Sequence, residues 1–334
     1  MLPNRLGLTF DWRNASVRRI GELARAAEAL GFGHLWIPEA WSTEFFSSAS
    51  HAVSVTKSIT VNAGIVNVYS RSAALIAMGV ATLCELAPGR IGLGLGASGK
   101  GVVERWHGAK FDRPLERTKE YVKLIRSVLN GGMLEHSGLA GELHGFRLFA
   151  ATPKQMPPIY LGALGRRNLE LAGEIADGAI LTLYPRSKLR AARDALQLKA
   201  SSSRKLYAVY PITTGGRSDA RSVNELKRWI SFYVASMGSY YRRLLVSAGY
   251  EKEVQRILDY KSRNMREESV NAVTEDMLDE LVLRGSLENV VERINSLSKE
   301  CEVVLGLFGG IDPSDAELWA RLHEVVRALE TSNS

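Results

Sequence analysis

The sequence predicts an α/β protein whose core is a closed barrel of eight parallel strands, each followed by a helix, the (β/α)8 or TIM architecture. Two observations lead to this prediction. Strand-like apolar runs alternate with segments of helical period along nearly all of the 334 residues. The strand-like runs lie near residues 6, 34, 62, 92, 159, 180, 208 and 304, which is the number that the barrel needs. An open, doubly wound parallel sheet is the rival architecture, and the strand number favours the barrel.

The first half of the chain is expected to supply four strands and three helices. Residues 6–10, 33–38, 59–66 and 91–95 are apolar or β-branched runs, which predict strands. Apolar side chains recur at helical spacing in residues 17–30, 73–86 and 114–129. Gly31, Pro88 and Gly131 follow these three segments, as is typical where a helix ends. Residues 133–148 then predict a hairpin.

Residues 157–184 predict strand, glycine loop, helix, turn and strand in succession. The loop runs from Gly162 to Gly165, and Asp177-Gly178 ends the helix. The first backbone N–H groups of a helix have no intrahelical partner and lie at the positive end of its dipole. This loop, followed by Arg166 and Arg167, therefore suits an anionic ligand. An ordinary βα loop with solvated arginines is the alternative that the segment by itself leaves open.

A long helical insertion is expected between the seventh and eighth strands. Residues 188–199 predict a helix and residues 206–212 the seventh strand. Residues 218–283 are rich in charged helix formers and carry scattered aromatic side chains, with apolar spacing for two or three amphipathic helices. An insertion at this place lies at the carboxyl mouth of a barrel, where it can close over substrate. A packing or oligomer surface is the equal alternative.

Composition bounds the function. The chain is 46% hydrophobic and 24% charged, as expected for a globular protein, and we expect one domain over residues 1–334. The first residues lack a signal peptide and no apolar run could span a bilayer, so a cytoplasmic location is expected, without membrane partners. Basic residues alternate with acidic ones, which argues against nucleic acid and suits a polyanionic small molecule despite the net charge of +7. Neither Cys84 and Cys301 nor the histidines have ligand spacing, so no metal is expected.

Four motifs together resemble the luciferase-like monooxygenase superfamily, in particular its branch that uses the deazaflavin coenzyme F420. They are AAEALGF at residues 26–32 leading to WIPE at 36–39, GIVNVYSR at 64–71, PGRIGLGLG at 88–96 and LELAGEIADG at 169–178. The resemblance covers nearly the whole chain. It implies a (β/α)8 fold, a homodimer, and F420 or flavin mononucleotide (FMN) bound at the carboxyl ends of the strands.

The expected cofactor site lies where the strand ends present small residues and backbone amides. Glycine at positions 64 and 96 lets the backbone approach a flat ring that side chains would keep away. The resemblance also implies a bulge with a cis peptide between Gly64 and Ile65 behind the ring. The residues expected to bind the cofactor are Gly64, Ile65, Val66, Asn67, Gly96, Ala97, Ser98, Ala163, Leu164, Gly165 and Arg166.

Two acids are the expected catalytic residues. Glu39 follows Pro38 at the end of the second strand and is the first choice, with helix capping as its alternative role. Relatives carry histidine after this acid, and Ala40 stands here. The methylenetetrahydromethanopterin reductases of the family carry further acids where Thr9 and Gly99 stand, and Asp11 is the expected substitute. Further candidates for substrate contact are Trp41, Phe45, Tyr69, Glu104, Trp106 and His107.

These expectations describe an oxidoreductase that transfers a hydride between F420 and a small organic substrate, for which a methylene-tetrahydropterin is one candidate. The basic surplus and the arginines after the glycine loop suit the acidic tail of F420. A two-component monooxygenase that uses FMN is the alternative. A homologue that binds cofactor without catalysis is the third, and the loss of histidine after Glu39 favours it.

Overall fold

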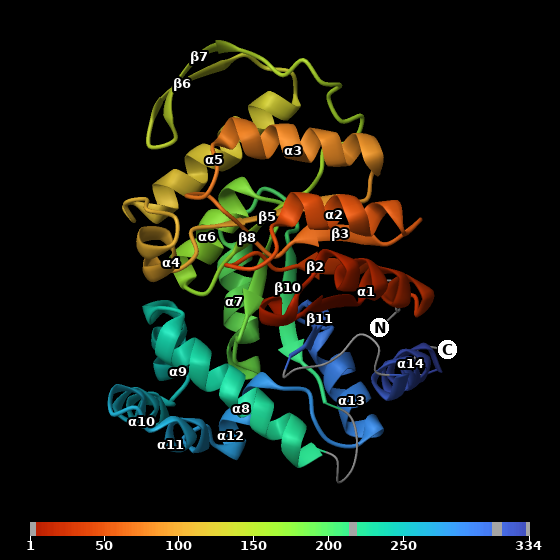
Figure 1. Ribbon diagram of the computed structural model, residues 1–334, viewed down its shortest axis with the longest axis vertical. Helices are drawn as coiled ribbons and strands as arrows, with labels where there is room; N and C mark the ends of the chain where they lie inside the picture. The colour runs from red at the N-terminus through yellow and green to blue at the C-terminus, as the bar shows by residue number, and fades with distance from the viewer. Residues whose placement is uncertain (1–4, 214–218, 309–315, 332–334) are drawn as a thin grey trace.

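The computed structural model describes residues 5–213, 219–308 and 316–331, and these form a closed parallel barrel surrounded by helices (Figure 1). The strands pair in the order β3-β2-β1-β11-β10-β9-β8-β5, and pairing between β3 and β5 closes the ring. The barrel strands are β1 (Gly7–Phe10), β2 (His34–Ile37), β3 (Thr60–Ala63), β5 (Ile91–Gly96), β8 (Ile159–Gly162), β9 (Gly178–Thr182), β10 (Lys205–Pro211) and β11 (Glu302–Leu307). The predicted barrel is confirmed, with all eight strands at the expected places.

The third strand is interrupted where the sequence predicts a continuous run. β3 ends at Ala63, and β4 (Val66–Asn67) resumes beside β5 after a two-residue break. The peptide bond between Gly64 and Ile65 in that break is cis, as the family resemblance implies. The break turns the chain at the carboxyl end of the barrel, so that Gly64 and Ile65 leave the ladder between β3 and β5.

The five helices predicted outside the insertion are confirmed, two of them with the predicted bounds. These are α1 (Val17–Ala29), α3 (Ala73–Leu86), α5 (Pro114–Leu129), α6 (Arg166–Ile175) and α7 (Leu189–Gln197). Caps explain where two of them begin, because the side chains of Ser16 and Ser72 accept hydrogen bonds from the backbone N–H of Arg19 and Leu75. Pro114 at the first position of α5 is another start signal.

Four further helices were not predicted. They are α2 (Phe45–Ser54), α4 (Lys100–Arg105), α13 (Leu287–Leu297) and α14 (Ala316–Thr331). The serine-rich α2 has weak helical propensity, and acidic side chains hold its first turn from outside it: Glu44 accepts hydrogen bonds from the N–H of Phe46 and Ser47. The formation of α2 thus depends on contacts outside the helix, because its own residues do not strongly favour a helix.

The insertion contains five helices, not the two or three expected. They are α8 (Asp219–Ser236), α9 (Ser239–Ser247), α10 (Glu251–Ser262), α11 (Arg266–Asn271) and α12 (Glu275–Leu281). Gly238, Gly249 and Asn264 divide the expected helices, because each has a left-handed backbone with φ of 103°, 97° and 58°. Figure 1 shows these helices gathered beyond the carboxyl end of β10.

The predicted hairpin, β6 (Leu134–Gly138) and β7 (Gly141–Phe146), is confirmed and projects from the barrel beyond α3 and α5 (Figure 1). Glu120 on α5 holds the turn of the hairpin, accepting a hydrogen bond from the N–H of Ala140 and pairing with His136 at 3.0 Å. The hairpin is therefore remote from the mouth of the barrel.

Aromatic rings fill the barrel below its mouth. Trp36, Tyr160 and Tyr207 are buried, and the ring centroid of Tyr207 lies 4.9 Å from that of Trp36 and 5.1 Å from that of Tyr160. Burial raises the pKa of the Tyr207 phenol, which therefore stays neutral. The packed rings make an apolar floor for any cavity above them.

None of the helices in the described part of the chain combines the length and the hydropathy that a membrane span requires.

Candidate functional site

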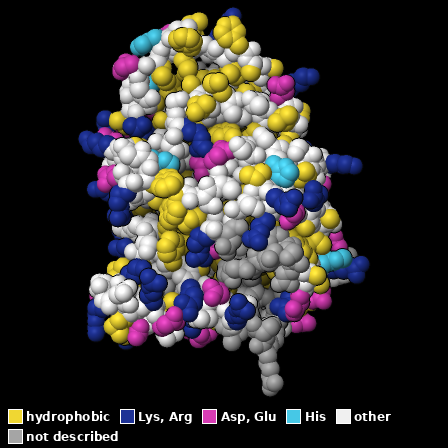
Figure 2. Space-filling view, in the orientation of Figure 1, with side chains coloured by type: hydrophobic (Ala, Val, Ile, Leu, Met, Phe, Trp, Pro, Cys, Tyr) yellow, Lys and Arg dark blue, Asp and Glu magenta, His cyan; other side chains and the backbone are white. Residues whose placement is uncertain are grey.

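A cavity opens at the mouth of the barrel between the strand ends and the helical insertion. Residues of β1, β2, β5, β8, β9 and β10 line it, together with residues of α5, α6, α8 and α9. Trp36 forms part of its floor. Figure 2 shows a band of hydrophobic side chains on this side of the molecule, beside α4 and above α9. The cavity lies where active sites of this architecture are found.

One side of the cavity, here called the small-residue face, consists of Gly64, Ile65, Gly96, Ala97, Gly162 and Ala163. These residues come from the break after β3 and from the ends of β5 and β8, which are neighbours in the barrel. The side chain of Ile65 lies against two glycines of the face, since a Cβ on Gly96 would lie 3.1 Å from its Cδ1 and one on Gly162 would lie 3.4 Å from its Cγ2. The face therefore presents backbone and one apolar side chain to a planar ligand.

The opposite side, here called the aromatic face, consists of Trp12, Trp41, Tyr233, Tyr240, Tyr241 and Phe308. Trp12 and Trp41 follow β1 and β2, and their ring centroids lie 4.4 Å apart at an interplanar angle of 64°. The indole N–H of Trp12 donates to the hydroxyl of Tyr233 over 3.3 Å, which ties the strand ends to the insertion. The aromatic face is thus assembled from distant parts of the chain.

Glu39 lies at the cavity and both of its carboxylate oxygens are engaged. Arg71 donates to them over 2.6 and 2.9 Å, and the backbone N–H of Phe45 donates over 2.8 Å at the start of α2. The two side chains are only 8% and 17% exposed, so the pair is largely removed from water. Glu39 therefore carries out the capping role foreseen as its alternative, and it also carries a charge into the cavity wall.

Asp11 does not line the cavity. Its carboxylate pairs with Arg13 and accepts a hydrogen bond from the backbone N–H of that residue over 3.0 Å, at the start of a short 3-10 helix, Trp12–Asn14. Thr9, two residues earlier, does line the cavity. The strand ends after Phe10, so the alternation that placed Thr9 and Asp11 on one face stops between them.

The expected cofactor residues divide into two groups. Those brought to the cavity are Gly64, Ile65, Gly96, Ala97, Ser98, Ala163 and Leu164. Val66 and Asn67 are buried behind the break, where the side chain of Asn67 accepts from the N–H of Tyr69 over 2.9 Å. Gly165 and Arg166 lie just outside the lining, although Leu164 and Asn168 on either side of them belong to it.

The start of α6 supports part of the expected anion site. Gly165 precedes the helix with no side-chain cap, and a Cβ placed on it would meet nothing within 4 Å, so space is open in front of the first N–H groups. The Arg166 guanidinium turns along its own helix and pairs with Glu170 at 2.7 Å, with 77% of its side chain exposed. The backbone, not Arg166, is presented to the site.

Of the further candidates for substrate contact, Trp41 lines the cavity and the others do not. Phe45 is fully buried in the core. Tyr69 stacks on Phe111 with centroids 5.4 Å apart and donates to the carbonyl of Asp112. Glu104 pairs with Lys100 at 3.8 Å, and Trp106 is largely exposed. Burial lowers the pKa of His107, and of the two nearby charges that of Glu39 raises this pKa and that of Arg71 lowers it.

Sequence reasoning missed several residues that line the cavity. Thr118, Asn168 and Thr182 come from α5, α6 and β9, and Met237 from the end of the insertion's first helix. The aromatic residues of the insertion were noticed, but their position at the cavity was left open. Residue type by itself did not distinguish them, because the side of a helix that meets the barrel depends on how the helix docks. Among the described residues, no group of three or more His, Cys, Asp or Glu side chains could hold a metal ion.

Comparisons with known proteins agree with this geometry. The sequence profile of the luciferase-like monooxygenase family matches residues 2–301. A 5,10-methylenetetrahydromethanopterin reductase of Archaeoglobus fulgidus is 29% identical over 283 residues, covering 82% of this chain and 84% of the relative.

Two solved structures share the fold. The F420-dependent tetrahydromethanopterin reductase of Methanopyrus kandleri matches with a TM-score of 0.83 at 20% identity, over 98% of this chain and 99% of that one. An F420-dependent secondary alcohol dehydrogenase, in complex with an F420-acetone adduct, matches with a TM-score of 0.78 at 20% identity and the same coverage. The matched profile and the barrel with its break after β3 lead to one assignment: this chain belongs to the luciferase-like monooxygenase family.

Proposed function

We propose that this protein is an F420-dependent oxidoreductase that transfers a hydride between the deazaflavin ring and a small organic substrate. The observation that carries the proposal is the small-residue face, where three neighbouring strand ends present glycine and alanine around Ile65. A planar tricyclic ring fits such a surface, because no side chain longer than alanine apart from Ile65 intervenes. A relative from Mycobacterium tuberculosis that is named as a putative coenzyme F420-dependent oxidoreductase, 27% identical over 323 residues, supports the choice of ring.

The residues that would hold the cofactor follow from this face. Gly64, Ile65, Gly96 and Ala97 would back the ring, and Ala163 and Leu164 would lead to its tail. The uncapped N–H groups at the start of α6 suit a phosphodiester. When bound there, F420 supplies a carbon that gives or takes a hydride.

Catalysis by this site would rest mainly on positioning. A hydride moves efficiently when its donor and acceptor carbons are held about 3 to 3.5 Å apart and water is excluded. The small-residue face and the aromatic face line the same cavity, so a ring and a substrate bound between them would be held against each other. Glu39, held by Arg71, would orient the cofactor or substrate instead of moving a proton freely. Asp11 keeps only a remote role, since Arg13 occupies its carboxylate.

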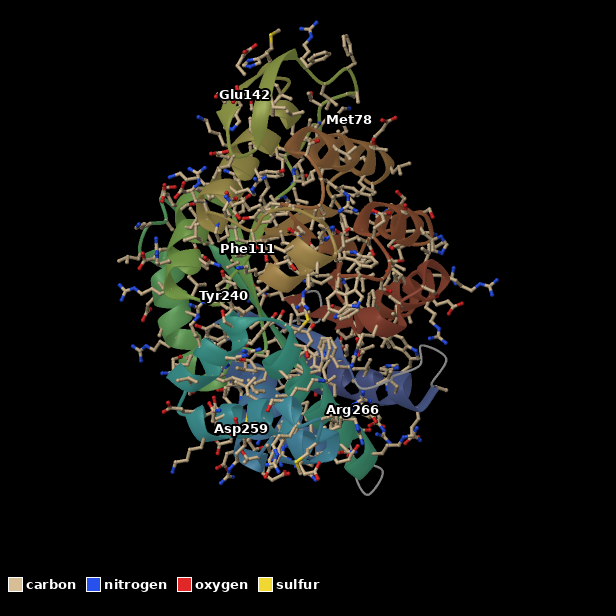
Figure 3. The ribbon with its side chains drawn as sticks, turned by 60° about the vertical axis from the view of Figure 1, so that its left-hand side comes forward. Met78, Phe111, Glu142, Tyr240, Asp259 and Arg266 are labelled. Atoms are coloured by element: carbon tan, nitrogen blue, oxygen red, sulfur yellow. The ribbon has the colours of Figure 1, made fainter. Side chains whose placement is uncertain are left out.

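The substrate and the assembly are part of the same proposal. A methylene-tetrahydropterin is one candidate, because the Archaeoglobus fulgidus relative is named for that reaction. We propose that the 334-residue chain acts as one catalytic unit in the cytoplasm, and that it works as a homodimer. Exposed apolar side chains on the outer face of α3, Leu75, Met78 and Leu86, support an oligomer, and Figure 3 shows Met78 at the surface below the hairpin. Sedimentation of the purified chain tests the dimer.

The decisive test is to titrate the purified protein separately with F420 and with FMN and to follow ligand fluorescence. We expect saturable F420 binding and at least about tenfold weaker FMN binding, because only F420 carries an acidic tail beyond its first phosphate. Tight FMN binding without F420 binding would replace the proposal by the two-component monooxygenase. Binding of F420 with no turnover of any hydride acceptor would favour the third alternative, a homologue that binds the cofactor without catalysis.

A further inference from the structure

We propose that the hydroxyl of Tyr241 donates a hydrogen bond to the substrate, and that the substrate is an uncharged, planar or apolar molecule with a carbonyl or imine acceptor. The inference rests on the proposed function and names the substrate class of that site. It depends on three features of the cavity: its charges, its hydroxyl groups and the shape of its aromatic face.

The charges come first. Among the lining residues that the structure describes, Glu39 is the one with an ionisable acidic or basic side chain, and Arg71 neutralises it. Arg13, next to the lining residue Trp12, is paired with Asp11. A substrate that carried a phosphate or carboxylate into this cavity would find no uncommitted cation among these residues. Burying an unpaired charge is costly, so the described part of the cavity lining favours a neutral substrate.

Three of the seven hydroxyl groups in the described cavity lining already have a hydrogen-bond partner. The hydroxyl of Thr9 donates to the carbonyl of Trp36 over 2.9 Å, and that of Thr118 donates to the carbonyl of Pro114 over 2.8 Å. The hydroxyl of Tyr233 is held by the indole of Trp12. The hydroxyls of Ser98, Thr182, Tyr240 and Tyr241 have no hydrogen-bond partner among the described residues, although all four residues line the cavity. That of Tyr241 belongs to a ring that Tyr233 holds in the aromatic face. It is therefore available to a ligand.

The position of Tyr241 is well defined by its neighbours. Its ring packs edge-on against Tyr233, with centroids 5.2 Å apart and an interplanar angle of 82°. Tyr240, beside it on α9, packs instead against the guanidinium of Arg243 at 4.9 Å, and Figure 3 shows Tyr240 where α9 approaches the barrel. Burial raises the pKa of Tyr241, so its hydroxyl keeps its proton and acts as a donor at neutral pH.

The aromatic face sets the shape of the substrate. Trp12, Trp41 and Tyr233 present ring faces and edges that stack on planar or apolar groups. A ligand between these rings and the small-residue face would lie flat. The hydroxyl of Tyr241 at its edge would then hold a carbonyl or imine acceptor in place, which is the group whose carbon accepts a hydride.

Ligand-observed NMR titration of the full chain tests the proposal with three probes of similar shape, with and without F420. Acetophenone has a ring and a neutral acceptor, ethylbenzene lacks the acceptor, and benzoate carries a charge. We expect acetophenone to bind at least about tenfold more tightly than benzoate. Tyr241→Phe should weaken acetophenone about fivefold and leave ethylbenzene unchanged.

The matched control is Tyr260→Phe on α10, a tyrosine of the same insertion outside the cavity lining, which should change neither probe. Loss of ethylbenzene binding in Tyr241→Phe would show a damaged fold, and the comparison of acetophenone with benzoate in the parent chain then decides. Benzoate binding as tight as acetophenone would overturn the proposal, as would an unchanged acetophenone affinity in Tyr241→Phe. Failure of F420 to bind, with the probe results as expected, would contradict the proposed function alone and would leave Tyr241 as a hydrogen-bond donor to a neutral ligand of this cavity.

Discussion

The two faces of the cavity are built in opposite ways. The small-residue face comes mainly from the backbone at the ends of three adjacent strands, and Gly96 and Gly162 lie in the hydrogen-bonded ladder itself. The aromatic face comes from the segments after β1, β2 and β11 and from α8 and α9, and side-chain contacts hold it together. A surface made of backbone tolerates little change, whereas one made of side chains can change one residue at a time. This difference suits a constant cofactor on one side and a variable substrate on the other.

The largest effect should follow from adding one carbon behind the small-residue face. In Gly94→Ala the new Cβ would lie 2.0 Å from the carbonyl oxygen of Ala63, a backbone atom that cannot move without the strand. We expect a loss of about 3 kcal/mol or more in the free energy of unfolding, measured by urea denaturation. Gly165→Ala, whose Cβ meets nothing within 4 Å, is the control and should lose less than about 1 kcal/mol. Equal losses in the two variants would refute the close packing of this face.

The next largest effect should come from Glu39, which also lines the cavity. Glu39→Gln leaves Arg71 with Glu44 alone at 3.1 Å, so we expect a loss of about 2 kcal/mol in the free energy of unfolding. Glu44→Gln should lose about 1 kcal/mol or less, because its side chain is 41% exposed. Chemical denaturation of both variants measures this. A fully stable Glu39→Gln protein that has lost activity would favour direct catalysis over orientation.

A smaller, pH-dependent effect should appear at Glu28, which holds the chain entering β3 below the small-residue face. Burial by itself would raise its pKa, but the N–H groups of Ser58, Ile59 and Lys57 lower the pKa from 4.5 to about 2. A lowered pKa stabilises the folded state above the unfolded value, so this contribution should be present above pH 4.5 and disappear as pH falls toward 2.

We expect Glu28→Gln to remove about 1 kcal/mol or less at neutral pH, since the group is partly exposed. Its unfolding free energy should also fall less steeply between pH 4.5 and 2 than that of the parent chain. Urea titrations at several pH values measure both. Parallel pH curves for the two proteins would contradict the assignment.

The smallest effect is expected at Arg166. Its guanidinium is exposed and paired with Glu170, so Arg166→Gln should change F420 affinity by less than about twofold in a fluorescence titration. A loss of tenfold or more would restore Arg166 as the anchor of the cofactor tail that the sequence predicts. It would also show that a side chain, and not only the backbone at the start of α6, holds the cofactor tail.

Much of the fold was predictable because its signals are local. The helix α5 has the predicted bounds, since Pro114 starts it and Gly131 follows it closely. The insertion was predicted in place but not in detail, because single residues with positive φ, such as Asn264, divide it without an obvious sequence signal. The helix α2 was not predicted, because its first turn depends on Glu39 and Glu44, which precede it.

The candidate site was predictable on one side only. Gly64, Gly96 and Ala163 were expected at the cavity and lie there, since strand ends of a parallel barrel must meet at one rim. Asp11 was expected on the same strand face as Thr9, but β1 ends at Phe10, so the strand alternation does not extend to Asp11. The partners of Glu39 and Arg166 were not predicted, since side-chain pairing depends on distances that the sequence does not contain.

The sequence by itself thus determined the barrel, its family and the ring of small residues, because periodicity and glycine placement act over a few neighbouring positions. Tertiary structure alone decided which charges are neutralised and which aromatic rings face the small-residue face. Trp12 and Tyr233 are 221 positions apart and meet only because the insertion docks on the strand ends. Contacts over such a separation arise from packing of the whole chain, for which no local pattern exists.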